Sequence, residues 1–208
     1  MEKTVLDATE RRRRIAGACL IFAPLVMLVA DVMLVAFGEE AGFWPWSFGL
    51  WLSFYLFIFA VLAIARLLSR GADRLGIVGG ALAIAGLLMG ATMQGMFRTF
   101  VSMEAREIDE ATMRAVHEPL IATTQVPGIL LPIGLLVLAT ALWKTRVMPR
   151  PMVLLFALGT LLFPVGRIIL GPSVSVVSDL LLLVALGDLG RRVLGSPTFW
   201  NPALKSMM

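Results

Sequence analysis

The chain has 208 residues, of which 59% are hydrophobic and 15% are charged, and its mean hydropathy is +0.89. Soluble domains average about 45–50% apolar residues, so these values exclude an ordinary soluble fold and predict one membrane domain. The net charge of +4 does not indicate a nucleic-acid partner, because the lysines and arginines stand in short segments between long apolar runs, where they orient a membrane protein.

Cysteine and histidine are too scarce for several kinds of site. Cys19 is the only cysteine and His117 the only histidine in the sequence. A single cysteine excludes an intrachain disulfide. One histidine with one cysteine excludes a multi-histidine metal centre or a bis-histidine haem within one chain. We therefore expect neither a metal nor a cofactor.

Six apolar runs predict an all-α bundle of six transmembrane helices. The first follows a basic segment, residues 1–14, and is longer than the apolar core of a secretory signal. The membrane domain spans 15–194 and is followed by a tail at 195–208. The predicted spans are Ile15–Phe37, Ser47–Leu68, Leu75–Phe100, Pro119–Trp143, Met152–Leu170 and Val174–Leu194.

Charge asymmetry between the connections predicts the orientation of the bundle. The N-terminal segment, the second and fourth connections and the C-terminal tail hold most of the Lys and Arg, whereas the other connections are acidic or nearly uncharged. By the positive-inside rule both termini are cytoplasmic. In the long third connection, Val101–Glu118, apolar positions recur at helical spacing, which predicts a short extracellular amphipathic helix between the third and fourth spans.

The third predicted span, Leu75–Phe100, has a smooth face that becomes polar near its outer end. Small residues recur along this face, and Gln94 and then Arg98 follow at the same spacing. Small residues allow membrane helices to approach closely, so we interpret the smooth part as a packing surface. Its members are Gly79, Ala83, Gly86 and Gly90.

Polar residues inside the spans give the strongest functional signal, because burying an ionisable group in a membrane is costly and such groups usually face the bundle interior. The predicted topology places them together in the outer half, where the two acids can balance the two arginines. His117 lies at the mouth of the fourth span, where it could act as a proton-linked switch. The candidate ligand-binding residues are Asp31, Gln94, Arg98, His117, Gln125, Arg167 and Asp179.

Two interpretations of this set remain open. Arginine's planar fork matches phosphate and carboxylate groups, so Arg98 and Arg167 could clamp a small anionic or lipid ligand. Alternatively, the Asp–Arg pairs only fix the register of the helices, or the arginines extend to the outer headgroups.

The sequence thus predicts an integral membrane protein with an outward-opening polar site for a small or lipid-like ligand, either transporter-like or receptor-like. One alternative is a membrane-embedded enzyme that acts on a lipid or isoprenoid, with His117, Glu118 or Asp179 as acid or base. Another is an assembly subunit whose glycine-rich third helix packs against a membrane partner or a second copy. In size and hydropathy the chain resembles small six-span bacterial membrane proteins, so we expect a multi-pass protein of the bacterial inner membrane.

Overall fold

The computed structural model is helical wherever it describes regular structure, and the described part of the chain contains no strand. It describes residues 2–38, 44–69, 71–104, 111–112, 114–115, 118–119, 123 and 128–200, without the side chains of 2–7, 44–45 and 97–104. The helices are α1 (Glu2–Phe37), α2 (Trp44–Leu68), α3 (Asp73–Glu104), α5 (Leu130–Thr145), α6 (Arg150–Val165), the π-helical turn η2 (Gly166–Leu170), α7 (Pro172–Gly195) and α8 (Pro197–Trp200).

Five of these helices are long and apolar enough to cross a membrane. They are Ala8–Phe37, Trp46–Leu68, Asp73–Met96, Arg150–Leu170 and Pro172–Gly195. The span Arg150–Leu170 corresponds to the fifth predicted span and consists of α6 together with η2. Helix α5 is apolar but has 16 residues, about 24 Å at 1.5 Å per residue. Half of the predicted extracellular helix, Val101–Glu118, and most of the residues expected to begin the span that contains α5 lie outside the described residues.

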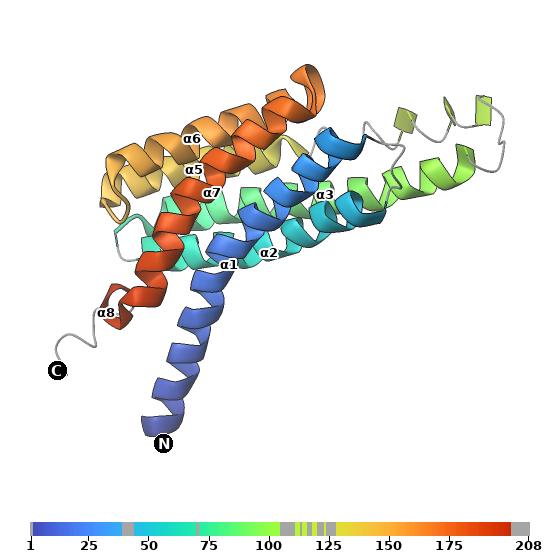
Figure 1. Cartoon of the computed structure of the whole chain (residues 1–208). Coiled ribbons are helices and arrows are strands. Elements are labelled where there is room, and N and C mark those ends of the chain that lie inside the picture. The colour runs from blue at the N-terminus through green and yellow to red at the C-terminus, as the bar shows by residue number, and fades with distance from the viewer. Residues whose placement is uncertain are drawn as a thin grey trace.

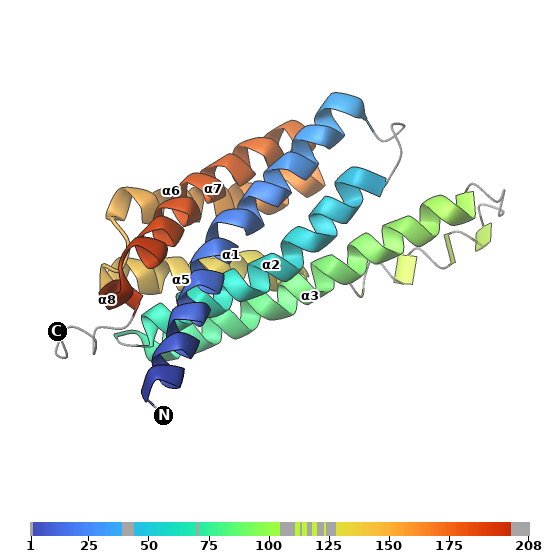
Figure 2. The same cartoon turned by 60° about the horizontal axis from the view of Figure 1, so that its bottom comes forward.

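The long helices form a closed ring in chain order (Figures 1 and 2). Helix α1 packs against α2 and α7, α3 packs against α2 and α5, and α6 packs against α5 and α7. The start of α1, the α2–α3 turn, the α5–α6 turn and α8 lie toward one end, which we call the terminal end. The end of α1 and the α6–α7 turn lie toward the other, which we call the opposite end. There α3 extends beyond α1 and α2 (Figure 2).

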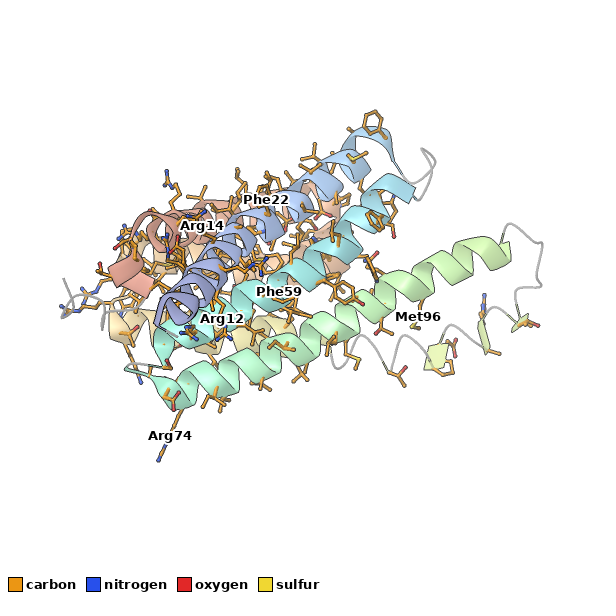
Figure 3. The ribbon with its side chains drawn as sticks, turned by 90° about the horizontal axis from the view of Figure 1, so that it is seen from below. Arg12, Arg14, Phe22, Phe59, Arg74 and Met96 are labelled. Atoms are coloured by element: carbon orange, nitrogen blue, oxygen red, sulfur yellow. The ribbon has the colours of Figure 1, made fainter. Side chains whose placement is uncertain are left out.

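Arginines gather at the terminal end of the bundle. Figure 3 shows Arg12, Arg14 and Arg74 there, whereas Met96 lies toward the opposite end of α3. The same view shows Phe22 and Phe59 on outer faces of the bundle, and both side chains are more than half exposed, at 52% each. Large exposed apolar side chains on such faces are expected where lipid, and not water, surrounds the helices.

Glycine contacts explain how α3 and α5 come so close. A Cβ on Gly134 would lie 2.7 Å from the carbonyl oxygen of Gly79 and would clash with the backbone nitrogen of Ala83; one on Gly86 would clash with the backbone of Leu131. The interpretation of the small-residue face as a packing surface is confirmed by these contacts. Because α5 occupies most of this face, it is not free to receive a partner, and the assembly-subunit hypothesis loses the feature on which it rested.

Helices α1 and α7 are joined at the terminal end by a buried arginine. Arg13 is 7% exposed, and its Nη1 donates hydrogen bonds to the carbonyl oxygens of Val193, at 2.8 Å, and Leu194. Its Nη2 lies 2.6 Å from Oε1 of Glu10. The last carbonyls of a helix have no partner within the helix, so Arg13 caps α7 while the Glu10 carboxylate balances its charge.

Candidate functional site

The sequence places an arginine at the one point where α6 departs from α-helical geometry. Pro164 has no N–H to continue the hydrogen-bond ladder, and the chain runs on as the π-helical turn η2, which contains Arg167. Such π-helical turns often occur at functional sites. Gly166 allows η2 to approach α7 closely, because a Cβ there would lie 2.6 Å from the backbone nitrogen of Ser175. Arg167 is thereby carried to the interface with α7.

Arg167 connects one acid of α1 with one acid of α7. Its Nη1 donates a hydrogen bond to Oδ1 of Asp31 at 3.2 Å, and its Nη2 lies 2.8 Å from Oδ2 of the same carboxylate. Only the first of these contacts is a hydrogen bond; the second is a close ion-pair contact, because Oδ2 of Asp31 has no hydrogen-bond partner within the described residues. The same Nη2 also donates to Oδ2 of Asp179, but at the longer distance of 3.4 Å. Asp179 is therefore held more weakly than Asp31.

The two carboxylates are buried more completely than the arginine that joins them. The side chains of Asp31 and Asp179 are 1% and 0% exposed, and that of Arg167 is 19% exposed. Oδ1 of Asp179 is buried and has no hydrogen-bond partner within the described residues. A buried acceptor without a partner loses its hydration without replacement. Oδ2 of Asp31 and Nε of Arg167 are likewise buried without a hydrogen-bond partner there. A donor is thus missing at each acid of the cluster, and an acceptor is missing at the arginine.

The charges of the cluster cancel among the described side chains only if one of the two acids is protonated. Two carboxylates share one guanidinium, and both approach the same Nη2 atom. If both acids are ionised, the cluster carries one excess negative charge, and like charges at this separation repel strongly in a medium of low dielectric constant. The expected balance of two acids by two arginines is not reached with these residues.

An apolar layer lies one helical turn from the charged cluster, on the side of the terminal end. Met27, Phe163 and Leu182 are three or four residues from Asp31, Arg167 and Asp179 on the same helices, and they close the bundle interior together with side chains of α2, α3 and α5. The cavity left among them is about 10 Å³, at the lower limit for a single water. The other members of the layer are Phe54, Phe57, Leu87, Leu131 and Leu135.

Phe163 belongs to both parts of the site. Its ring centroid lies 4.6 Å from Cζ of Arg167, within the range of a cation–π contact. Phe163, Met27 and Leu182 were not among the site residues predicted from the sequence. Phe163 could have been found from its position four residues before Arg167, because residues at this spacing are neighbours on a helix surface. Met27 and Leu182 carry no signal that separates them from other core residues.

Of the remaining predicted site residues, only Gln94 has a described side chain, and it does not join this cluster. Gln94 lies on α3, which packs against α2 and α5, on the far side of the ring from α7. Its Oε1 is buried without a hydrogen-bond partner among the described residues. The backbone of Arg98 belongs to the same helix, but its side chain lies outside the described part, as do His117 and Gln125 altogether.

No family model matches the chain, and neither a curated protein nor a solved structure is detectably similar to it.

Proposed function

We propose that this multi-pass membrane protein has six spans, with both termini in the cytoplasm, and carries a small-ligand site in the outer half of the bundle. The basic terminal end supports this orientation under the positive-inside rule. The cluster of Asp31, Arg167 and Asp179 lies toward the opposite end and so belongs to the outer half. Above a closed apolar layer, such a cluster suits a receptor or one conformational state of a transporter.

The observation that carries the proposal is the unsatisfied Asp179 carboxylate. It is fully buried, its Oδ1 lacks a donor among the described residues, and the cluster around it has an excess of acid. A ligand with an ammonium or amidinium group would supply both the missing donor and the missing positive charge. We therefore propose an organic cation. An anion could accept a hydrogen bond from Nε of Arg167, which has no partner within the described residues, but it would add negative charge to a cluster that already has two acids and one arginine.

The described residues favour an organic cation over a bound metal ion. Within them, no group of three His, Cys, Asp or Glu side chains is placed to hold a metal. Two carboxylates that already share an arginine provide few free oxygens, whereas Ca²⁺ takes six to eight oxygen ligands and Mg²⁺ requires a nearly octahedral set. A single ammonium group needs only one or two acceptors.

The test is to identify small molecules that remain with the purified protein. The protein would be prepared in mild detergent, denatured, and its extract analysed by mass spectrometry, beside the variant Asp179→Asn. Asn keeps the size of the side chain and removes its charge, so the variant should fold. We expect a cationic compound with the wild type that is depleted in the variant. Equal amounts with both proteins, or no bound compound, would overturn the proposal.

A further inference from the structure

A second cavity lies at the terminal end of the bundle, away from the charged cluster. It has a volume of about 490 Å³ and is formed where the end of α2, the α2–α3 turn, the α5–α6 turn and α8 meet. This volume is within the range of small-molecule pockets. Its lining includes Leu67, Lys144, Thr145, Val147, Thr198 and Phe199.

The lining combines an apolar part with one cation. Leu67, Val147 and Phe199 supply apolar surface, and Lys144 supplies the only charge among the lining residues that the structure describes. Lys144 is exposed and forms no ion pair with any residue that the structure describes. The hydroxyl of Thr145 already donates to the carbonyl oxygen of Ala141 at 2.9 Å. Lys144 is therefore the principal donor that the pocket offers to a ligand.

One exposed tryptophan and the basic residues around the pocket favour a position near the lipid headgroups. Trp143 directly precedes Lys144 and is 40% exposed, and Cζ of Arg150 lies 5.2 Å from its ring centroid. On α8, next to Phe199, Trp200 is buried, at 2% exposure, and its ring lies 5.1 Å from Cζ of Arg66. Of these two tryptophans, only Trp143 faces the surroundings. Tryptophans with neighbouring basic residues are typical of the membrane–water interface. A ligand in this pocket would meet both the headgroup layer and the first part of the acyl region.

We propose that this pocket binds the headgroup of an anionic phospholipid, with Lys144 contacting the phosphate and the apolar lining contacting the glycerol and upper acyl carbons. A cation beside apolar surface matches an amphiphile better than a free anion, which would leave Leu67, Val147 and Phe199 without a partner. Basic pockets between membrane helices are known to hold such headgroups. The inference is independent of the ligand proposed for the Asp179 site.

The test is native mass spectrometry of the protein in mild detergent, titrated with phosphatidylglycerol or with phosphatidylcholine of the same acyl chains. We expect tighter binding of phosphatidylglycerol. The variant Lys144→Gln should weaken it about fivefold, the effect of one basic residue near a membrane surface. Arg191→Gln is the matched control: it removes the same charge from a side chain that is 77% exposed on α7 and does not line the pocket. It should change binding little.

A second variant separates the pocket from its charge. Val147→Trp fills the cavity and keeps every basic residue, so it should also reduce phosphatidylglycerol binding, and thermal unfolding would confirm that it is folded. The proposal would be wrong if Arg191→Gln weakened binding as much as Lys144→Gln, because the attraction would then be general to the surface. It would also be wrong if a large excess of inorganic phosphate displaced the lipid, or if Val147→Trp bound it unchanged.

Discussion

Both terminal nitrogens of Arg167 contact Asp31: Nη1 donates a hydrogen bond to Oδ1 at 3.2 Å, and Nη2 lies 2.8 Å from Oδ2. These two residues are far apart in the sequence and come from η2 and α1, on opposite sides of α7 in the ring. The pair therefore ties α1 to the end of α6 across the helix that carries Asp179. It makes Arg167 a structural residue of the cluster and leaves one oxygen of each acid, Oδ2 of Asp31 and Oδ1 of Asp179, without a hydrogen-bond partner among the described residues.

Replacing Arg167 should reduce the stability of the protein more than replacing either Asp31 or Asp179. The variant Arg167→Gln leaves two buried carboxylates without a counter-charge, and the loss of one partner of a buried ion pair typically costs about 3–5 kcal/mol. We expect a large fall in the unfolding temperature in detergent. Adding Asp31→Asn to Arg167→Gln should recover part of this loss, since one of the uncompensated charges disappears. If the double variant were no more stable than Arg167→Gln alone, Arg167 would not be the counter-charge of Asp31.

Much of the fold could be predicted from the sequence, because length, hydropathy and the positions of arginines suffice to place long apolar helices. Asp31, Arg167 and Asp179 could be selected for the same reason, since charges are rare and conspicuous in such helices. Their mutual arrangement could not be predicted, because it depends on the π-helical turn after Pro164 that carries Arg167, and nothing in the sequence pattern specifies such a turn. The sequence suggested two balanced Asp–Arg pairs, whereas the described cluster has one arginine between two acids.

The close packing of α3 on α5 should be disrupted when a side chain is added at Gly134. A Cβ on Gly134 would clash with the backbone of Ala83, and neither backbone can move without separating the helices. We expect Gly134→Ala to destabilise the protein by about 1–3 kcal/mol, as overpacked cores do. Gly187→Ala is the control, because no atom lies within 4 Å of its added Cβ, and it should leave stability unchanged or raise it slightly. Equal losses of stability in the Gly134→Ala and Gly187→Ala variants would argue against the close packing of α3 on α5.

Arg13 and Arg14 are adjacent in sequence but should contribute differently to the stability of the fold. Arg13 is buried and caps the end of α7, whereas the side chain of Arg14 is 73% exposed and pairs with Glu10. Hydrogen bonds from charged groups contribute about 1.5–3 kcal/mol, so Arg13→Gln should lower the free energy of unfolding by that order. Exposed ion pairs contribute about 0–1 kcal/mol, and Arg14→Gln should have little effect. Thermal unfolding of the two variants would reveal any reversal of this order.

The proposed orientation can be tested by labelling single cysteines in intact cells. Cys19 is buried in α1 and would first be replaced by Ala. Ser69 is exposed at the terminal end, and Ser173 is exposed beside the α6–α7 turn at the opposite end. A membrane-impermeant thiol reagent should label the Ser173→Cys variant and spare Ser69→Cys until the cells are opened. If Ser69→Cys alone were labelled in intact cells, the orientation would be the reverse of the one proposed.

The most direct test of the Asp179 site is a thermal-unfolding screen of the wild type and Asp179→Asn with matched small cations and anions. The panel would pair organic ammonium compounds with carboxylates of similar size, because a ligand that binds only the folded state raises its stability. The account predicts that at least one ammonium compound raises the unfolding temperature of the wild type and has little effect on the variant. Stabilisation by the carboxylates instead, or an equal response of both proteins to the ammonium compounds, would contradict it.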